Sequence, residues 1–294
     1  MAPPLLTRFA PSPTGHLHLG HVVNALYVWG AAGAVGGKVL LRIEDHDRQR
    51  SRLEFERSII EDLDWLGFRS ETPTVRQSER TDLYQQQFER LRASRLAYVC
   101  SCSRKEMALA APDIPGQEMR YPGTCRHRNL DWRKGLSWRV QLESESVKFT
   151  DARLGVQVQV PAEQCGDLQL MDRLGNWTYQ FAVTVDDYLQ GINLVIRGED
   201  LLPSTGRQIM LARLLGRLDT PVFLHHSLIL KPDGKKLSKA QRDTGIRELR
   251  EQGESAQLVL GRAALAGGLI DHVREVRKEE VVGLVGQRYR FNAD

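Results

Sequence analysis

The chain has 294 residues, of which 41% are hydrophobic and 27% are charged, with a net charge of +4 and a pI of about 8.9. This composition is that of a globular protein with one large or two modest domains. No apolar run approaches the roughly 20 residues of a membrane span, and the N-terminus lacks a signal-peptide pattern. We therefore expect a cytoplasmic protein, and a monomer because nothing in the sequence indicates an interface.

Strands and helices alternate along the first 97 residues. Short aliphatic runs predict strands over residues 5–10 and 38–45, and helical spacing of apolar residues predicts helices over residues 20–33, 51–68 and around 83–91. This strand–helix–strand–helix order predicts an α/β fold with a parallel sheet of the dinucleotide-binding type.

The pattern changes after residue 97 and returns near residue 191. Cysteines, a Pro/Gly-broken stretch and alternating strands such as "GVQVQV", whose three valines share a face, predict an inserted α+β module. A strand, a helix, another strand and a lysine-rich loop follow, and the end of the chain has helical spacing. We expect four segments: the first half of a core (1–97), the insert (98–190), the second half of the core with the lysine loop (191–240) and a helical tail (241–294).

The stretch "PSPTGHLHLGH" joins the first predicted strand to the first predicted helix. This order places His18, Gly20 and His21 at a helix N-terminus, where backbone N–H groups and the helix dipole favour an anion. Gly20 lets a ligand approach the backbone closely, and imidazole donors can stabilise charge on a phosphoryl group. Alone, so short a motif is equally typical of a turn with solvated histidines.

A second candidate phosphate-binding feature is the loop "KKLSK", within a segment (231–250) that has seven Lys or Arg and three Asp or Glu. Lys236 and Lys239 can neutralise triphosphate charge during displacement at the α-phosphorus. The preceding "PDG" is also typical of a turn in a flexible basic loop. The two motifs together, in this order around an α/β sheet, are more specific than either one.

The cysteines indicate a metal site. Cys100 and Cys102 form a CxC pair, and Cys125 follows, a spacing that suits structural zinc but supplies three of its four ligands. Disulfides are rare in cytosolic proteins. The residues leave open whether the fourth ligand is Tyr121, His127 or Cys165, and the alternative is three unrelated buried thiols.

Several blocks, taken together, resemble the catalytic core of the glutamyl-tRNA synthetases, a class I aminoacyl-tRNA synthetase family. They are "RFAPSPTGHLHLGH", "LLRIEDHD", "YQFAVTVDD" and "VIRGEDLLPSTGRQ", followed by "KLSK". The histidine and lysine motifs match the family's HIGH and KMSKS motifs. The blocks keep the family's order from Arg8 to about Ala240. The resemblance implies a class I synthetase Rossmann-type parallel sheet with an inserted α+β zinc-bearing module and a short helical tail.

The resemblance also implies the reaction, in which L-glutamate is activated by ATP with Mg²⁺ and then transferred to tRNA. It implies catalytic roles for His18, His21 and Lys239. The residues it places at ATP are His18, Gly20, His21, Lys236 and Lys239. The residues it places at glutamate are Arg8, Ala10, Ser12, Glu44, Tyr179 and Arg197.

Charge complementarity favours the same amino-acid site. Glutamate has two carboxylates and one ammonium, so Arg8 and Arg197 can each bind a carboxylate as a bidentate fork, and Glu44 can bind the ammonium. The structural alternatives are surface ion pairs, which are common and weak. They would join Arg197 to Glu199 or Asp200, and Glu44 to Arg42 or Arg48.

The acidic pairs Glu44–Asp45 and Asp186–Asp187 also resemble paired carboxylates for acid–base work or magnesium binding. We discount that role, because the implied reaction needs phosphate neutralisation more than a protein base, and Mg²⁺ arrives with ATP.

More narrowly, the cysteine cluster and the end of the chain about 55 residues after the lysine loop resemble the glutamyl-queuosine tRNA(Asp) synthetases. These enzymes attach glutamate to queuosine in the anticodon loop. Their pattern, CxC and then Tyr-x3-Cys, fits "YPGTC" and selects Tyr121. The resemblance thus implies a structural zinc on Cys100, Cys102, Tyr121 and Cys125, and the queuosine-bearing anticodon stem-loop of tRNA(Asp) as partner.

Three alternatives share parts of this pattern. A minimal glutamyl-tRNA synthetase would charge tRNA 3′ ends, and a glutamate ligase would use a small-molecule acceptor. A non-catalytic binding module is disfavoured because it predicts decay of the histidine and lysine motifs, which are both intact.

Overall fold

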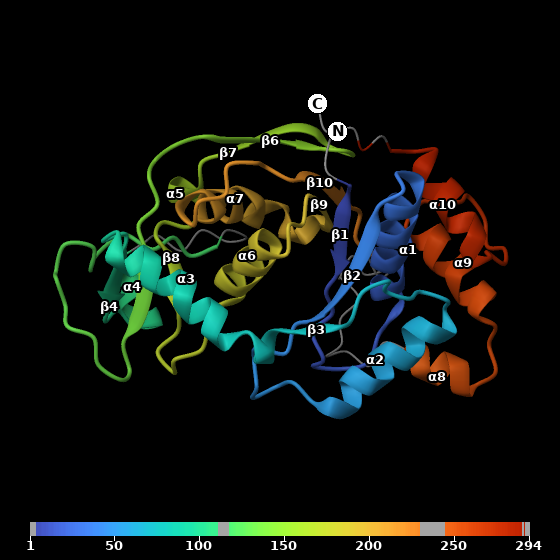
Figure 1. Cartoon of the computed structure of the whole chain (residues 1–294), viewed down its shortest axis with the longest axis horizontal. Coiled ribbons are helices and arrows are strands. Elements are labelled where there is room, and N and C mark those ends of the chain that lie inside the picture. The colour runs from blue at the N-terminus through green and yellow to red at the C-terminus, as the bar shows by residue number, and fades with distance from the viewer. Residues whose placement is uncertain (1–3, 111–117, 230–244, 290, 292–294) are drawn as a thin grey trace.

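The computed structural model describes residues 4–110, 118–229, 245–289 and 291 (Figure 1). Its strands are β1 (Leu6–Phe9), β2 (Lys38–Ile43), β3 (Val75–Arg76), β4 (Ala97–Cys100), β5 (Ser137–Val140), β6 (Val147–Asp151), β7 (Gly155–Gln159), β8 (Leu168–Met171), β9 (Leu194–Gly198) and β10 (Val222–His226). Its α-helices are α1 (Leu19–Ala34), α2 (Leu53–Trp65), α3 (Thr81–Ala93), α4 (Arg104–Ala110), α5 (Pro161–Gln164), α6 (Tyr179–Leu189), α7 (Thr205–Leu214), α8 (Ile246–Glu251), α9 (Ala256–Ala266) and α10 (Lys278–Gly286).

Parallel strands form the centre of the molecule. One sheet has the order β1-β2-β3 and another has the order β7-β6-β10-β9, in which only the β6–β7 pair is antiparallel. Asn193 joins the two sheets, because its backbone N–H donates to Leu6 O at 3.1 Å and its side-chain oxygen accepts from Leu6 N at 2.7 Å. The expected α/β fold with a parallel sheet is confirmed.

Both faces of the central strands are covered by helices. In β9, Leu194 and Ile196 pack into a core with α1, α9 and α10, whereas Val195 packs into a second core with α6 and α7. This alternation follows from the period of two along a strand. Burial on both faces explains the nearly continuous aliphatic sequence of these strands. The helices expected after residue 241 are α8, α9 and α10, and two of them cover α1 (Figure 1).

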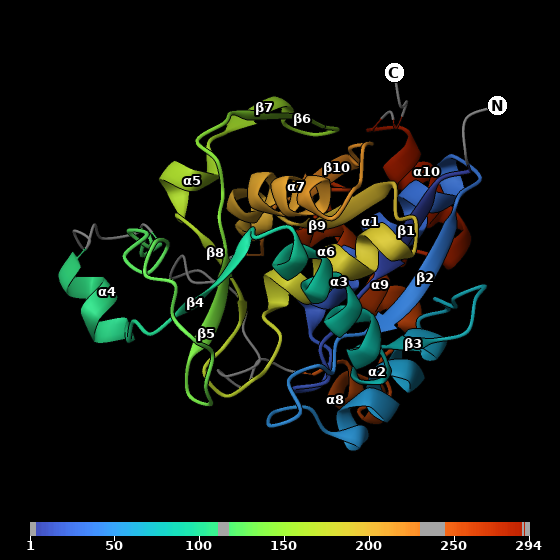
Figure 2. The same ribbon diagram turned by 60° about the vertical axis from the view of Figure 1, so that its left-hand side comes forward.

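The segment between residues 98 and 190 contributes to two sheets. Strands β4, β5 and β8 form a separate antiparallel sheet, which lies to one side of the central strands (Figure 2). Strand β6 instead pairs with β10, where Asp151 lies opposite Phe223. The valines of β7 do share a face, but Val156 and Val158 are 58% and 61% exposed. The proposed division into four segments stays a prediction.

In α2, Leu53 and Ile60 lie near helical spacing but are 71% and 38% exposed, so they do not belong to the buried side. Within the described part of the chain, no helix has the length and apolar character that crossing a membrane requires. The cytoplasmic location and the monomeric state stay predictions.

A buried network of charges connects α6 to the first two strands. Asp187 accepts from Arg8 Nε at 3.0 Å and from Arg42 Nη1 at 2.8 Å. The Arg42 side chain is fully buried and also lies 3.3 Å from Glu44. Burial alone would raise the pKa of Asp187, but the two guanidinium groups hold it below its usual value. The carboxylate therefore stays charged and holds the start of the parallel sheet against α6.

The neighbouring carboxylate anchors α3 to the same helix. Asp186 accepts from Tyr84 Oη at 2.8 Å, from Arg80 Nε at 2.6 Å and from Gln77 Nε2 at 2.8 Å. Asp186 and Asp187 thus have structural partners on several elements, as expected from discounting them as an acid–base pair. A buried carboxylate needs such partners because desolvation is costly.

Replacing Asp187 tests this network. Asp187→Asn leaves Arg8 and Arg42 without their shared counter-charge, so we expect a loss of about 3–5 kcal/mol in the free energy of unfolding, measured by urea denaturation. The exposed pair of Asp64 and Arg69 provides the control, and Asp64→Asn should cost less than about 1 kcal/mol.

The pH dependence gives a second readout of the same network. Because the folded-state pKa of Asp187 is depressed, its contribution is present above its unfolded-state pKa and is lost as pH falls through the folded-state pKa. Equal stability of wild type and Asp187→Asn near neutral pH would contradict this account.

Candidate active site

A cavity of about 350 Å³ lies at the carboxyl ends of β1, β2, β9 and β10 and beside the N-terminus of α1. This is the edge at which parallel α/β sheets bind ligands. Among the residues predicted for ATP or glutamate, those that line it are Arg8, Ala10, His18, Gly20, His21, Glu44, Tyr179 and Arg197. Ser12 is not among the described lining residues, and Lys236 and Lys239 lie outside the described residues.

His18 and His21 cap α1 reciprocally. His18 Nδ1 accepts from the backbone N–H of Gly20, and His21 Nδ1 accepts from the backbone N–H of His18, each at 3.1 Å. The two rings lie 3.9 Å apart, centroid to centroid. A neutral imidazole that accepts at Nδ1 carries its proton on Nε2. The capping geometry thus gives an Nε2–H donor to each of these two cavity-lining residues.

Gly20 is required by the packing of His18. A Cβ atom on residue 20 would lie 2.9 Å from His18 Cε1 and 3.1 Å from His18 Nδ1. Real Cβ atoms essentially never approach another heavy atom to 2.9 Å, so a side chain here would displace the capping imidazole. The glycine of the "HLGH" motif therefore has a steric role at this site.

Arg197 is a buried guanidinium held by neutral groups. Its Nη1 donates to Gln208 Oε1 at 2.6 Å, its Nη2 to Thr205 Oγ1 at 2.9 Å, and its Nε to His225 Nε2 at 3.1 Å. Among the described residues no carboxylate forms an ion pair with it. Glu199, one partner considered from the sequence, pairs with Arg153 instead.

His225 orients Arg197. Its Nδ1 lies 2.7 Å from Asp151 Oδ2, and burial lowers its pKa, so the ring is neutral at neutral pH. With Nδ1–H donating to Asp151, Nε2 is left as the acceptor for Arg197. The chain Asp151–His225–Arg197 fixes the guanidinium without pairing it with an acid. Sequence reasoning missed this role, although two adjacent histidines within a predicted strand were a visible signal.

Arg8, Glu44 and Tyr179 line the same cavity. The charge of Arg8 is partly compensated by Asp187. Glu44 pairs with Arg42, one of the partners considered from the sequence. Burial raises the pKa of Glu44, although Arg42 and Arg8 act in the opposite direction. A ligand ammonium beside Glu44 would therefore favour its charged form.

Other lining residues were not predicted. They include Asn24, Asp200, His226 and Ser227. His226 stacks on Tyr27 with ring centroids 5.0 Å apart, and burial lowers its pKa to about 4. It therefore offers a neutral ring to the cavity, next to Asn24 at 3.2 Å.

Both described flanks of the lysine loop lie near the histidine motif. Ile229 lines the cavity. Gly245 forms an antiparallel bridge with His18, and the next residue, Ile246, donates its backbone N–H to Leu17 O at 2.8 Å. The chain thus leaves and rejoins the described structure next to the cap of α1.

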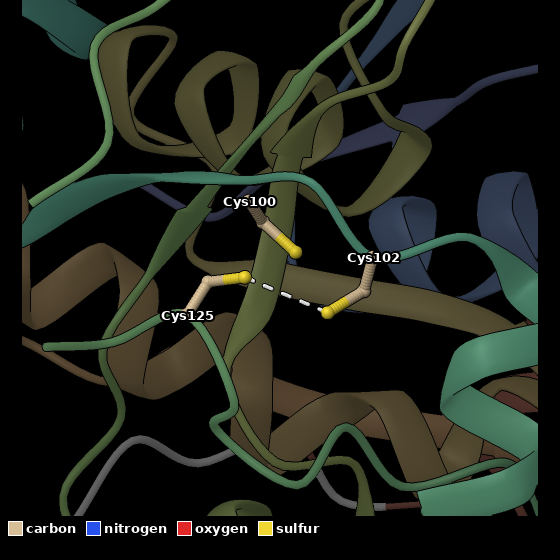
Figure 3. Close-up of side chains that lie close together, drawn as sticks. All are labelled: Cys100, Cys102 and Cys125. Atoms are coloured by element: carbon tan, nitrogen blue, oxygen red, sulfur yellow. Dashed lines mark hydrogen bonds between the residues drawn. The ribbon is translucent and has the colours of Figure 1, made fainter. Parts of the chain in front are cut away.

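The three cysteines of the predicted metal site converge at the end of β4. The sulfur atoms of Cys100, Cys102 and Cys125 all lie within 4.8 Å of one another and point toward a common centre (Figure 3). Tyr121 Oη lies 3.4 Å from Cys100 Sγ. Tetrahedral zinc with Zn–S bonds of about 2.3 Å needs sulfurs at roughly this separation. The donors fit a zinc ion, and the structure brings all four predicted ligands together.

The thiols of the cluster differ in how readily they ionise. Burial opposes ionisation of Cys125, but hydrogen bonds from the backbone and side chain of Ser101 outweigh it and lower the pKa to about 6. Burial and the neighbouring thiols raise the pKa of Cys102 to about 12. His127 is exposed, and Cys165 bonds to Pro161 O away from the cluster.

Zinc analysis tests the site. We expect about one zinc per wild-type chain by elemental analysis, and loss of the ion with a lower melting temperature in Cys102→Ser, because three donors hold zinc poorly. Cys165→Ser is the matched control and should keep the zinc. Retention of zinc by Cys102→Ser, or its loss from Cys165→Ser, would refute the assignment.

Comparison with known proteins agrees with this geometry. A family model described as tRNA synthetases class I (E and Q), catalytic domain, matches residues 4–285. The glutamyl-Q tRNA(Asp) synthetase of Symbiobacterium thermophilum is 40% identical over 296 residues, covering 95% of this chain and 91% of the relative.

Two longer proteins are also similar. Glutamate–tRNA ligase 2 of Syntrophus aciditrophicus is 39% identical, and the alignment covers 94% of this chain but 60% of that protein. The crystal structure of a glutamate tRNA ligase from Elizabethkingia meningosepticum, in complex with its amino acid, matches with a TM-score of 0.80 and 28% identity. That match covers 99% of this chain and 66% of the solved chain.

The family match spans nearly the whole chain, and the alignment with the Symbiobacterium relative covers most of both proteins. The chain is therefore a ligase that belongs to the class I tRNA synthetases of the glutamate and glutamine type, in the family of the glutamyl-Q tRNA(Asp) synthetases.

Proposed function

We propose that this protein activates L-glutamate with Mg-ATP and transfers the glutamyl group to queuosine in the anticodon loop of tRNA(Asp). The observation that carries the proposal is Arg197, a buried guanidinium in the cavity whose described partners are all neutral. A buried charge needs a counter-charge. A ligand carboxylate would provide it.

Glutamate fits the remaining charges of the cavity. Arg197 binds one carboxylate, Arg8 contributes positive charge for the other, and Glu44 receives the ammonium. Tyr179 lines the cavity beside them and adds a hydroxyl group. We assign the side-chain carboxylate to Arg197, so that the neutral amide of glutamine would leave this guanidinium without its counter-charge and glutamate is favoured over glutamine as the substrate.

The cap of α1 suits the first chemical step. A glutamate carboxylate oxygen attacks the α-phosphorus of ATP, the bond to the β-phosphate oxygen breaks, and pyrophosphate leaves. The Nε2–H groups of His18 and His21, with the helix N-terminus, stabilise the negative charge that builds on the phosphoryl oxygens. Mg²⁺, bound to ATP, neutralises the triphosphate.

Lys236 and Lys239 belong to this step in the proposal. The flanks of their loop at Ile229 and Gly245 support a role beside the triphosphate. Lys239 is the proposed catalytic lysine, and Lys236 assists in binding the phosphates.

The second step transfers the glutamyl group. A hydroxyl oxygen of the acceptor attacks the carbonyl carbon of glutamyl-adenylate, the bond to AMP breaks, and the hydroxyl proton is released. Queuosine has such hydroxyls on its cyclopentenediol ring. Coverage of 91% of the Symbiobacterium glutamyl-Q tRNA(Asp) synthetase favours this acceptor.

Charging of tRNA 3′ ends is the second candidate. The 39% identity with Syntrophus glutamate–tRNA ligase 2 favours it, although this chain covers 60% of that protein. Both candidates use the same cavity and the same first step, so the acceptor has to be determined by experiment.

Transfer of labelled glutamate to two bulk tRNA pools separates these candidates. One pool comes from a host that makes queuosine and the other from a host that does not. We expect ATP-dependent label in the first pool alone, on tRNA(Asp), because the second pool lacks the acceptor hydroxyls. Equal labelling of both pools would instead establish 3′-end charging.

Replacing Gly20 tests the capping histidines. In Gly20→Ala the new methyl group displaces His18, and we expect the rate of glutamate-dependent ATP–pyrophosphate exchange to fall about 100-fold, since a misplacement of about 1 Å costs that much. Gly283→Ala is the control, because a Cβ there meets open space in α10. Wild-type exchange by Gly20→Ala would exclude a catalytic role for the cap.

A further inference from the structure

A second cavity, of about 460 Å³, lies between the small sheet β4-β5-β8 and the N-terminal turns of α6 and α7. Figure 2 shows this sheet beside the two helices. Polar and charged side chains line much of the cavity, among them Arg104, Glu118, Arg139, Gln180 and Arg207. None of the residues assigned above to ATP or glutamate is among its described lining residues.

Two of its arginines are buried and incompletely paired. Arg139 is 6% exposed and Arg207 is 3% exposed. The Nε atom of each is buried and has no hydrogen-bond partner among the described residues. Arg139 donates through Nη1 to Asp167 O at 2.8 Å and lies over the ring of Tyr121 at 3.8 Å. Both guanidinium groups therefore keep unused donor capacity at the cavity.

The acids of the cavity do not cancel this charge. Asp167 is engaged by Arg126 at 2.5 and 2.9 Å and by Tyr98 Oη at 2.5 Å, so its carboxylate is already paired. Glu118 pairs with Arg207 at 2.6 Å, but its side chain is 58% exposed. An incoming anion with several acceptor oxygens would compete with Glu118 for Arg207 and would also accept hydrogen bonds from Arg139.

The cavity adjoins the active site through α6. Tyr179 lines the active-site cavity, whereas its neighbours Thr178 and Gln180 line the second one. A hydrogen-bonded chain also connects them, since Gln180 accepts from Gln208 at 2.8 Å and Gln208 accepts from Arg197 at 2.6 Å. The two cavities therefore lie next to each other at the start of α6, so a polymer bound at the active site can extend toward the second one.

We propose that this cavity binds a backbone phosphate of the RNA strand that carries the acceptor nucleoside, with Arg139 and Arg207 as its ligands. The inference rests on the proposed function for the presence of an RNA substrate. Guanidinium forks match phosphate geometry, and phosphate contacts position a nucleic acid without reading its sequence. The site would thus hold the strand while its hydroxyl reaches the glutamyl-adenylate.

Binding of a fluorescent, queuosine-bearing tRNA(Asp) anticodon stem-loop tests the site. Arg207→Gln removes one phosphate ligand, so we expect the Kd to rise about 10-fold. The slope of log affinity against log salt should become shallower by about 0.7. Arg213→Gln, at an exposed position on the same helix, is the matched control and should change neither quantity.

Glu118→Gln gives a prediction of opposite sign. It removes the competing carboxylate from an exposed side chain, so we expect the Kd to fall severalfold, a gain that a merely structural role for the arginines would not produce. Unchanged binding in both Arg207→Gln and Glu118→Gln would overturn the proposal. A higher KM of Arg207→Gln for ATP or pyrophosphate, with unchanged RNA binding, would also overturn it. The cavity would then bind the phosphate of a nucleotide or a free pyrophosphate and not that of an RNA backbone.

Failure of the proposed function gives a different result. In that case wild-type protein would transfer no glutamate to the queuosine-bearing stem-loop, although ATP–pyrophosphate exchange continues. Opposite shifts in RNA affinity for Arg207→Gln and Glu118→Gln would still establish the phosphate site.

Discussion

The Asp187 carboxylate, shared by Arg8 and Arg42, is the interaction on which the site depends. It joins β1 and β2 to α6, and α6 places Tyr179 at the cavity. The neighbouring Asp186 holds α3 against the same helix through Tyr84. Desolvation makes such a network expensive unless every charge is paired. Here the pairing fixes the relative positions of β1, β2 and α6.

The two arginines of the cavity, Arg8 and Arg197, have partners of different charge. Arg8 is already compensated in part by Asp187, whereas Arg197 is oriented by His225, Thr205 and Gln208, all neutral. Arg8 thus has a structural partner, whereas we propose that the charge of Arg197 is kept for a ligand. This division explains how a cavity with buried charges stays folded before substrate binds.

The two phosphate-binding sites that we propose are built in a similar way. At the cap of α1, backbone donors are satisfied by His18 and His21, which in turn present Nε2–H groups to the cavity. In the second cavity, Arg139 and Arg207 use some of their guanidinium nitrogens for contacts within the fold. The Nε atom of each has no hydrogen-bond partner among the described residues. In both places, groups that hold the fold together are the donors that we propose for phosphate.

Much of the fold follows from local patterns in the sequence. β1 and β2 follow from aliphatic runs and α1, α2 and α3 from apolar periodicity, and the metal-ligand spacing of Cys100, Cys102 and Cys125 predicted that they cluster. The pairing of β6 with β10 could not be predicted, because it joins residues more than 70 positions apart, Asp151 and Phe223. The exposure of the valine face of β7 could not be predicted either, since alternation alone does not say which face is buried.

The candidate site was predictable where motifs are local and was missed where partners are distant. The histidine motif and Arg197 could be found, but the chain Asp151–His225–Arg197 and the Asp187 bridge depend on contacts between separate elements. The roles in ATP and glutamate binding stay predictions for all of these residues, and for Ser12, Lys236 and Lys239 the position at the cavity stays a prediction as well.

The central claim is that Arg197 awaits a substrate carboxylate. The most direct measurement is ATP–pyrophosphate exchange with L-glutamate and with L-glutamine, for wild type and for Arg197→Gln. We predict that glutamate supports exchange at least about 100-fold better than glutamine in the wild type, and that this preference collapses in the variant. Equal exchange with both amino acids in the wild type would contradict the account.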